Sequence, residues 1–339
     1  MCAGNYAEGV DQGNASRAGG AGNCYLEGVP EGPSLVILRE LTQSFAGQRI
    51  RAAEGNSKID KARLVGQPIV ALRTWGKHFL IELDGFAIRI HFLMFGSYCI
   101  DSRKDRPPRL ALSFARGREL NFYSCAVRYI EGDLDEEYDW PADVMSDAWD
   151  PALARRKLKA MPDTLVCDAL LDQNVFAGVG NIIKNEVLFR IRVHPLSKVG
   201  AIPPRKLGEL IKQARQYSFE FLEWKKAFVL RKHWLAHNKR VCPRCQIPLT
   251  RQYLGTTDRR SFFCERCQVR YGTSRAGRSA PSPSPSASQS PSQSASQSPA
   301  PSPAAARKRR ARQPSDERPP LRSTPAGRRP RKATARLRG

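Results

Sequence analysis

Apolar and polar positions follow one spacing at the start of the folded part of the chain and a different spacing after it. Residues 35–41 place aliphatic side chains at helical intervals, which predicts an amphipathic helix over residues 33–46. Residues 49–130 instead consist of short apolar runs separated by turn signals such as Asp84-Gly85, a pattern typical of antiparallel strands joined by hairpins. We therefore expect an N-terminal antiparallel β-sandwich that carries one helix at its start.

Helix signals replace the strand pattern after the acidic stretch at residues 133–149. Asp150 followed by Pro151 is a typical helix start, because an aspartate side chain caps free N–H groups and proline suits the first turn. Further helices are predicted at 164–173, 180–191 and 204–234. The fold class expected from this order is α+β, with the helices gathered in a C-terminal domain.

Both ends of the chain differ from its middle in composition. Residues 1–29 are rich in glycine and lack apolar periodicity, so we expect a disordered extension. Residues 273–339 are Ser/Pro/Ala repeats followed by Arg/Lys clusters and predict a disordered basic tail. Between these ends we expect a β-sandwich domain at 30–145, a helical domain at 146–236 and a small cysteine-bearing module at 237–272.

Charge narrows the class of partner. The chain has a formal net charge of +24, and its sequence pI is about 10.1. Residues 274–339 hold 15 Lys/Arg against 2 acidic residues and so supply +13, which leaves +11 for the rest of the chain. A basic surface of this size predicts a polyanionic partner, most often nucleic acid. The most apolar run, Phe86–Ile100, is interrupted by charge and is too short to span a bilayer, so we expect no membrane partner.

The cysteines divide into a paired group and a scattered group. Four of the nine form two CxxC pairs separated by 18 residues, which are Cys242, Cys245, Cys264 and Cys267. Two such pairs predict one structural zinc ion in a closed four-thiolate shell, carried by a β-hairpin that forms a zinc ribbon. The alternative is a redox dithiol. The scattered cysteines argue for a reducing cytoplasm and against a disulfide framework.

Pro30 and Glu31 offer chemistry that depends on where the chain begins. As a first residue, Pro30 is a secondary amine that is nucleophilic near neutral pH, because α-amino groups titrate near ~8. It can then attack C1′ of a deoxyribose, form an iminium and allow strand scission by elimination, with Glu31 as general acid or base. As an internal residue, Pro30 has an amide nitrogen and none of this applies. Separately, Gly178 and Gly180 precede a predicted helix, a weak signal for phosphate binding at its amino end.

Several segments together resemble one family. In chain order they are Pro30-Glu31-Gly32-Pro33, Gly76-Lys77-His78, His91–Gly96, Gln173–Glu186 and the four-cysteine ribbon. This ordered set resembles the formamidopyrimidine-DNA glycosylase/endonuclease VIII family over about residues 30–270, and its opening is closer to the endonuclease VIII branch. The resemblance implies a helix–two-turn–helix motif in the helical domain.

The resemblance also implies catalytic roles. Pro30 would form the Schiff base and Glu31 would protonate the sugar oxygen. Lys77 would contact the phosphate near the lesion, and Glu186 matches an acidic position of the family motif.

Further residues are implied to hold DNA. Asn181 and a hairpin arginine would bind the flanking phosphates; Arg259 fits the family position, and Arg260 remains an alternative. Met94 would fill the void left when the damaged nucleotide flips out.

The sequence departs from the family pattern at four places. Ser34 stands where many members have glutamate, and Arg260 replaces a small residue. Val127 stands where the formamidopyrimidine branch has a void-filling arginine, which favours oxidised pyrimidines as substrates. Pro30 is preceded by 29 residues. In bacteria a valine codon can start translation and is then read as methionine, which is normally removed before a proline. We therefore hypothesise that translation starts at position 29 and that the working protein begins at Pro30.

These observations favour a bifunctional DNA glycosylase and apurinic/apyrimidinic lyase of base excision repair. It would act as a monomer on damaged double-stranded DNA in a bacterial-type cytoplasm, associated with the nucleoid. The alternatives are a non-catalytic DNA-binding relative on the same scaffold and a zinc-ribbon module with a role in transcription.

Overall fold

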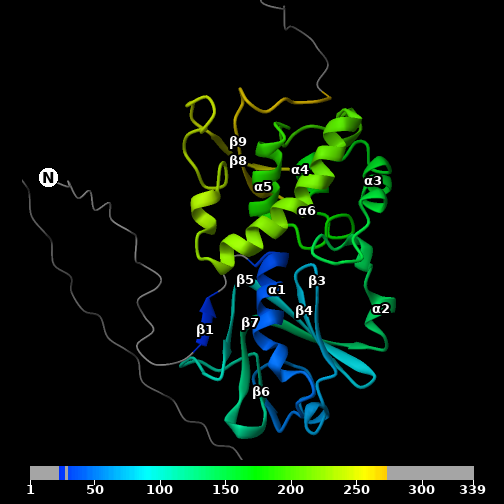
Figure 1. The fold of residues 1–339 in the computed structure, drawn as a ribbon, viewed down its shortest axis with the longest axis vertical. Coiled ribbons are helices and arrows are strands. Elements are labelled where there is room, and N and C mark those ends of the chain that lie inside the picture. The colour runs from blue at the N-terminus through cyan, green and yellow to red at the C-terminus, as the bar shows by residue number, and fades with distance from the viewer. Residues whose placement is uncertain (1–22, 27–29, 273–339) are drawn as a thin grey trace, which may run out of the picture. The chain divides into compact units, whose positions relative to one another are not determined.

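In the computed structural model, which describes residues 23–26 and 30–272, the N-terminal half is an antiparallel sheet. Its strands are β1 (Asn23–Leu26), β2 (Ala52–Glu54), β3 (Ala71–Trp75), β4 (His78–Leu83), β5 (Phe86–Ile100), β6 (Leu110–Ser113) and β7 (Glu119–Glu131). They are hydrogen-bonded in the order β2-β6-β7-β5-β4-β3, and β1 pairs with β5 (Figure 1).

The sheet curls over one apolar core. The rings of Phe79 on β4 and Phe122 on β7 lie 6.0 Å apart, although β5 separates the two strands in hydrogen-bonding order. The pairing of β5 with β7 shifts register between Phe92 and Ser97. Because a β-bulge bends a strand, the two layers of the predicted sandwich form one continuous sheet that shares β5 and β7.

The predicted first helix is confirmed as α1 (Gly32–Thr42), which a 3-10 turn at Gln43–Phe45 extends. Leu35 and Leu38 are buried in the core of the sheet, while Leu41 is 39% exposed. The apolar stripe that predicts this helix is therefore the face that packs on the strands.

The C-terminal half is helical, with α2 (Leu134–Glu137), α3 (Pro151–Lys159), α4 (Val166–Ala169), α5 (Asn181–Arg190) and α6 (Pro204–Lys226). The side chain of Asp150 caps α3 by accepting the N–H of Ala152 at 2.7 Å, as predicted. The helix expected over 164–173 is only the single turn α4. The long α6 ends at Lys226, before a 3-10 turn at Leu230–His233. It packs against both α1 and α5, and so joins the two halves (Figure 1).

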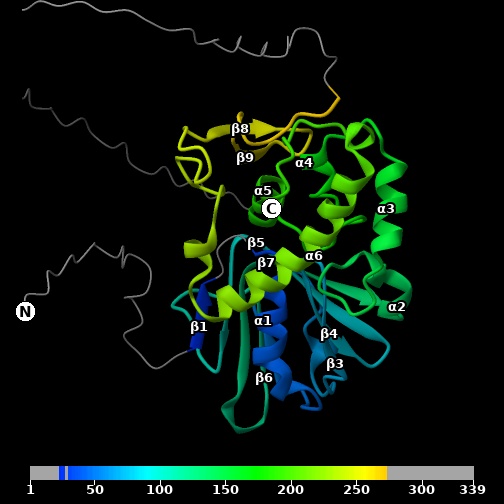
Figure 2. The ribbon, with the colours of Figure 1, turned by 45° about the horizontal axis from the view of Figure 1, so that its top comes forward.

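The predicted hairpin of the cysteine module is β8 (Thr250–Leu254) paired with β9 (Arg259–Phe263), and it lies beside α5 (Figure 2). Two residues of the hairpin turn have positive φ, which is 74° at Gly255 and 45° at Asp258. No helix in the described part of the chain is long and apolar enough to cross a membrane.

One expectation about the N-terminal extension is wrong. Cys24 forms a disulfide with Cys99, against the expectation drawn from the scattered cysteines, and residues 23–26 form β1, which pairs antiparallel with Ser97–Ile100. The physical reason is that β4 pairs only with the first half of β5, so the second half has an edge that can accept another strand. The rest of 1–29 and all of 273–339 fall outside the described residues, so the disorder predicted for them stays a prediction.

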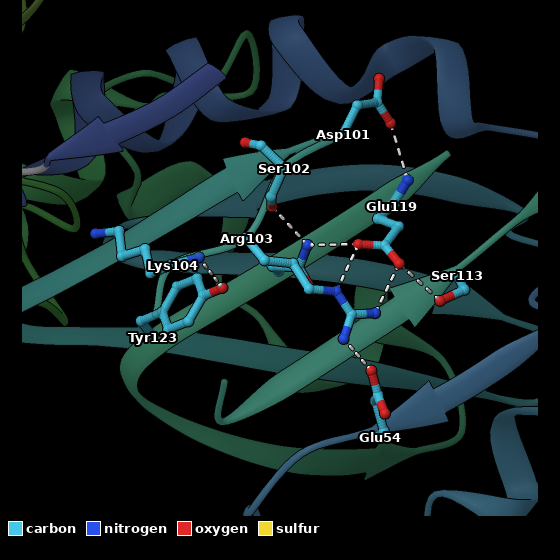
Figure 3. Close-up of polar contacts among 9 residues, drawn as sticks. Glu54, Asp101, Ser102, Arg103, Lys104, Ser113, Glu119 and Tyr123 are labelled. Carbon is cyan, nitrogen blue, oxygen red and sulfur yellow. Dashed lines mark hydrogen bonds and ion pairs between the residues drawn. The ribbon is translucent and has the colours of Figure 1, made fainter. Parts of the chain in front are cut away.

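The connection between β5 and β6 is held by an arginine that bridges two strands (Figure 3). Arg103 donates to Glu119 of β7 at 2.6 and 2.7 Å, and also to Glu54 of β2. These bonds lower the pKa of Glu119. Because the pairs are partly exposed, their role is to order the loop, with little effect on stability.

Candidate functional site

Glu31 lies where the two halves of the protein meet. It precedes α1 in extended conformation, and Pro30 beside it is buried. Its carboxylate accepts the backbone N–H groups of Gly180, Ile182 and Ile183 at 3.2, 2.7 and 3.1 Å. These are free N–H groups of the first turn of α5, so a carboxylate there is stabilised by hydrogen bonds and by the helix dipole.

Glycines on both sides allow the start of α1 to come close to the start of α5. The N–H of Gly32 donates to the carbonyl of Gly178 at 2.8 Å, and a Cβ on Gly32 would lie 2.9 Å from the Cα of Gly178. A Cβ on Gly180 would lie 2.4 Å from the carboxyl carbon of Glu31. The weak phosphate signal in this turn is thus corrected, because the anion bound at the amino end of α5 is Glu31 itself.

Burial and the mutual attraction of Glu31 and Lys77 shift the pKa values of these two groups in opposite directions. Burial raises the pKa of Glu31, while the charge of Lys77 and the three N–H groups lower it. Lys77 lies in the turn between β3 and β4; burial lowers its pKa, the charge of Glu31 raises it, and Arg259 lowers it. Lys77, Glu31 and Arg259 therefore come from three separate parts of the chain into one electrostatic group.

The structure separates the two hairpin arginines. Arg260 donates to the hydroxyl of Tyr253 at 2.5 Å, and its guanidinium lies over that ring. The charge of Arg259 instead acts on Lys77 and on Lys184. Arg259 is therefore the hairpin cation whose charge acts on Lys77 beside Glu31, and the guanidinium of Arg260 is engaged within the hairpin.

Three side chains on one face of α5 hold strand β9. Asn181, Lys184 and Asn185 all donate to the carbonyl of Arg260, at 3.0, 3.5 and 3.3 Å. Lys184 also donates to the hydroxyl of Ser261 at 2.8 Å, and its burial lowers its pKa to about 8. The sequence singled out Asn181 as a phosphate contact, which stays a prediction, and it singled out neither Lys184 nor Asn185. Their helical spacing from Asn181 was the available signal.

Carboxylates from the helical half hold the rest of the ribbon. Asp168 of α4, which the sequence reasoning missed, accepts the N–H groups of Thr256 and Thr257 in the hairpin turn at 2.9 and 3.1 Å. Glu186 is fully buried and accepts three backbone N–H groups of residues 235–237, at 2.8, 2.9 and 2.6 Å. These bonds join Glu186 to the residues that lead into the ribbon and do not join it to Glu31. Glu186 is therefore placed to position the ribbon.

Met94 lies on an exposed apolar segment of β5. It is 54% exposed, between Leu93 at 52% and Phe95 at 79%, and all three fall within the register shift of β5. The Met94 side chain therefore does not lie in the core. The same location makes Phe95 and Leu93 available for contact, and the sequence reasoning did not single them out.

The four paired cysteines come together as predicted. Their sulfur atoms all lie within 4.8 Å of one another, with Cys242 and Cys267 at 3.8 Å and Cys245 and Cys264 at 3.4 Å. A tetrahedral zinc with bonds of about 2.3 Å needs sulfur atoms separated by roughly 3.8 Å. The donor set and its spacing fit such an ion.

Comparison with known proteins defines the class of this fold. Residues 29–125 match the formamidopyrimidine-DNA glycosylase N-terminal domain, and residues 142–227 match the formamidopyrimidine-DNA glycosylase H2TH domain. Together the two matches cover more than half of the chain. They define a two-domain protein of the formamidopyrimidine-DNA glycosylase type, with the junction described above between its domains.

Individual relatives support the same class. The mouse protein named endonuclease 8-like 3 is 31% identical over 66% of this chain and 39% of its own length. The Mycobacterium bovis protein named endonuclease 8 2 is 32% identical over 42% of this chain and 60% of its own. The chain thus belongs to the formamidopyrimidine-DNA glycosylase/endonuclease VIII family, and it spans less than half the length of the mouse relative.

A solved structure shows the same fold. The Lactococcus lactis formamidopyrimidine-DNA glycosylase, determined non-covalently bound to DNA containing an AP site, has a TM-score of 0.62 and 21% sequence identity. The similarity covers 70% of this chain and 99% of that one.

The role of Glu186 is testable by its effect on stability. Glu186→Ala leaves three buried or partly buried N–H groups without an acceptor, and we expect the free energy of unfolding to fall by about 3 kcal/mol. Urea unfolding followed by circular dichroism measures this. The matched control is Glu223→Ala on the exposed face of α6, which should change stability by less than about 0.5 kcal/mol. Equal stability of the two variants would contradict the assignment.

Proposed function

We propose that the chain is a bifunctional DNA glycosylase and apurinic/apyrimidinic lyase that removes oxidised bases in base excision repair. The observation that carries the proposal is the Pro30–Glu31 pair held at the amino end of α5, in one group with Lys77 and Arg259. Its family membership and the names of its relatives support the same activity.

The proposed reaction begins when the free amine of Pro30 attacks C1′ of the damaged nucleotide. The N–C1′ bond forms as the bond from C1′ to the base breaks, and the base leaves with the bonding electron pair and takes up the proton that the proline nitrogen loses. Glu31 protonates the sugar oxygen as the ring opens, which leaves an iminium between Pro30 and C1′. A buried carboxyl whose pKa is raised by desolvation is suited to donate that proton. Loss of a C2′ proton from the resulting iminium then expels the 3′ phosphate, and a second elimination expels the 5′ phosphate.

The remaining site residues would hold the DNA. Lys77, Asn181 and Arg259 would bind phosphates around the flipped nucleotide, and Met94 would enter the base stack from its exposed segment of β5. Two cations that face one buried carboxylate leave the group with a net positive charge, which favours an anionic ligand.

We propose that oxidised pyrimidines are favoured. Val127 is buried in β7 and paired with Ile90 of β5. This position therefore offers no side chain that could enter the DNA strand opposite the lesion. The substrate is damaged double-stranded DNA, the acting species is a monomer, and the setting is a bacterial-type cytoplasm at the nucleoid.

The chemistry requires that the active form begins at Pro30. The match to the family's N-terminal domain starts at residue 29, which supports an active chain whose first residue is Pro30. A chain that keeps residues ahead of Pro30 would be the non-catalytic DNA-binding alternative, because the proline nitrogen is then an amide.

Borohydride trapping tests this chemistry. Protein that begins at Pro30 should form a covalent adduct with DNA containing an abasic site, because borohydride reduces the iminium to a stable amine. The matched control begins at Val29 and differs by one residue. It should bind the same DNA in a gel shift but give at least about a hundredfold less adduct, since an amide nitrogen is not nucleophilic. Equal trapping by both forms would overturn Pro30 as the nucleophile.

The two hairpin arginines should differ in binding. Arg259→Ala removes a phosphate contact, and we expect it to weaken binding of abasic-site DNA by about tenfold and to reduce the salt dependence by about one unit of slope. Arg260→Ala should change the affinity by less than about threefold, because its guanidinium is engaged with Tyr253. Fluorescence anisotropy over a salt series measures both. A larger effect at Arg260 would reverse the assignment.

The cysteine cluster would hold one structural zinc ion. The ribbon carries Arg259, so removing zinc with a chelator should lower DNA affinity to the level of Arg259→Ala or below. Zinc release, measured with a colorimetric dye, should reach one ion per chain. Full DNA affinity after complete zinc release would contradict this structural role.

A further inference from the structure

Phe228 is an exposed aromatic residue held in an unfavourable backbone conformation. It directly follows the end of α6, it is 92% exposed, and its φ is +59°. A non-glycine residue rarely adopts positive φ, and a bulky one does so at a further energetic disadvantage. Exposure of the ring to water adds a second unfavourable contribution, so neither feature stabilises the fold.

The surrounding contacts fix this conformation. The N–H of Phe228 donates to the carbonyl of Lys225 at 3.1 Å, and the N–H of Val229 donates to that of Trp224 at 2.9 Å. The rings of Trp224 and His233 stack at 4.2 Å with an interplanar angle of 2°. The segment therefore projects the phenylalanine ring from a defined backbone.

Both ends of this segment are attached beside the Glu31 group. At its start, Lys225 donates to the hydroxyl of Ser34 at 2.6 Å, and Ser34 lies in the first turn of α1, three residues after Glu31. At its end, residues 235–237 are held by Glu186 of α5, the helix whose amino end binds Glu31. Residues 227–234 thus connect the start of α1 to α5, the two elements that build the site.

The segment is also basic. Residues 225–240 contain six Lys/Arg and no carboxylate. Arg231 and Lys232 are exposed, and neither forms a salt bridge with any residue that the structure describes. An exposed aromatic ring among unpaired cations is the combination that proteins use to bind unpaired nucleic-acid strands, where rings stack on bases and cations bind phosphates.

We propose that Phe228 is a base-stacking residue that packs on an unpaired nucleobase next to the reaction site, with Arg231 and Lys232 on the adjoining phosphates. The inference rests on the proposed function and adds a contact to it. In the proposed function Met94 reaches the DNA from β5 in the N-terminal half, whereas Phe228 projects from the connection between α6 and the ribbon. The two apolar side chains therefore approach the DNA from different halves of the protein.

The test uses the protein that begins at Pro30 and an oligonucleotide with an abasic-site analogue and 2-aminopurine at a neighbouring position. Phe228→Gly should weaken binding by about tenfold, the effect of losing one stacked base. The change in 2-aminopurine fluorescence on binding should be lost, whereas Phe228→Trp should retain it. The salt dependence of binding should stay unchanged in Phe228→Gly and should fall in the double variant of Arg231 and Lys232 to alanine.

Stability separates this role from a structural one. Glycine relieves the positive φ, so the melting temperature of Phe228→Gly should equal or exceed that of the wild type while DNA binding weakens. The control is Phe219→Ala, which removes a half-buried phenylalanine of α6 that packs on Arg215 and should leave the fluorescence change intact.

The outcomes distinguish this inference from the proposed function. If Phe228→Gly binds the oligonucleotide with wild-type affinity and fluorescence, stacking by Phe228 is overturned even if the wild type is trapped by borohydride. If the wild type shows the stacking signal but no trapped adduct, the proposed lyase activity fails and the Phe228 contact stands. A wild type that does not bind the oligonucleotide overturns both.

Discussion

The carboxylate of Glu31 at the amino end of α5 is the contact on which the arrangement of this protein depends. It links the segment that begins the β domain to the first turn of a helix in the other domain. The same three hydrogen bonds hold the carboxylate beside Pro30, so the docking of the domains and the position of the proposed reactive pair depend on one interaction. Burial works against the charge of Glu31 and raises its pKa, and the helix terminus and Lys77 oppose this effect only in part.

Polar side chains of the helical domain also hold the ribbon in place. Asp168 holds the hairpin turn, Lys184 and Asn185 hold the strand, and Glu186 holds the preceding loop. All four come from α4 and α5, so Arg259 is positioned by the helix that also binds Glu31. Buried polar groups of this kind stabilise one arrangement of two modules, because each unpaired partner would be strongly unfavourable.

Local patterns predicted most of the helices, the ribbon hairpin and the cysteine cluster correctly. The stripe of Leu35 and Leu38, the cap at Asp150 and the paired cysteines each involve residues close together in sequence, so spacing alone identifies them. Predictions failed where a distant partner decides the structure. The strand at residues 23–26 exists because the edge of β5 accepts it, and nothing in its own sequence carries that information.

The sequence by itself therefore determined the order of the elements, the metal-binding pattern and the family, because these depend on periodicity, on ligand spacing and on the order of short motifs. Only the tertiary structure decided that Glu31 occupies the amino end of α5, that the charge of Arg259 acts on Lys77, and that Glu186 holds a loop. It alone placed Phe228 in the solvent with a positive φ. Each of these depends on close approach between residues far apart in the chain, and a linear pattern does not record such distances.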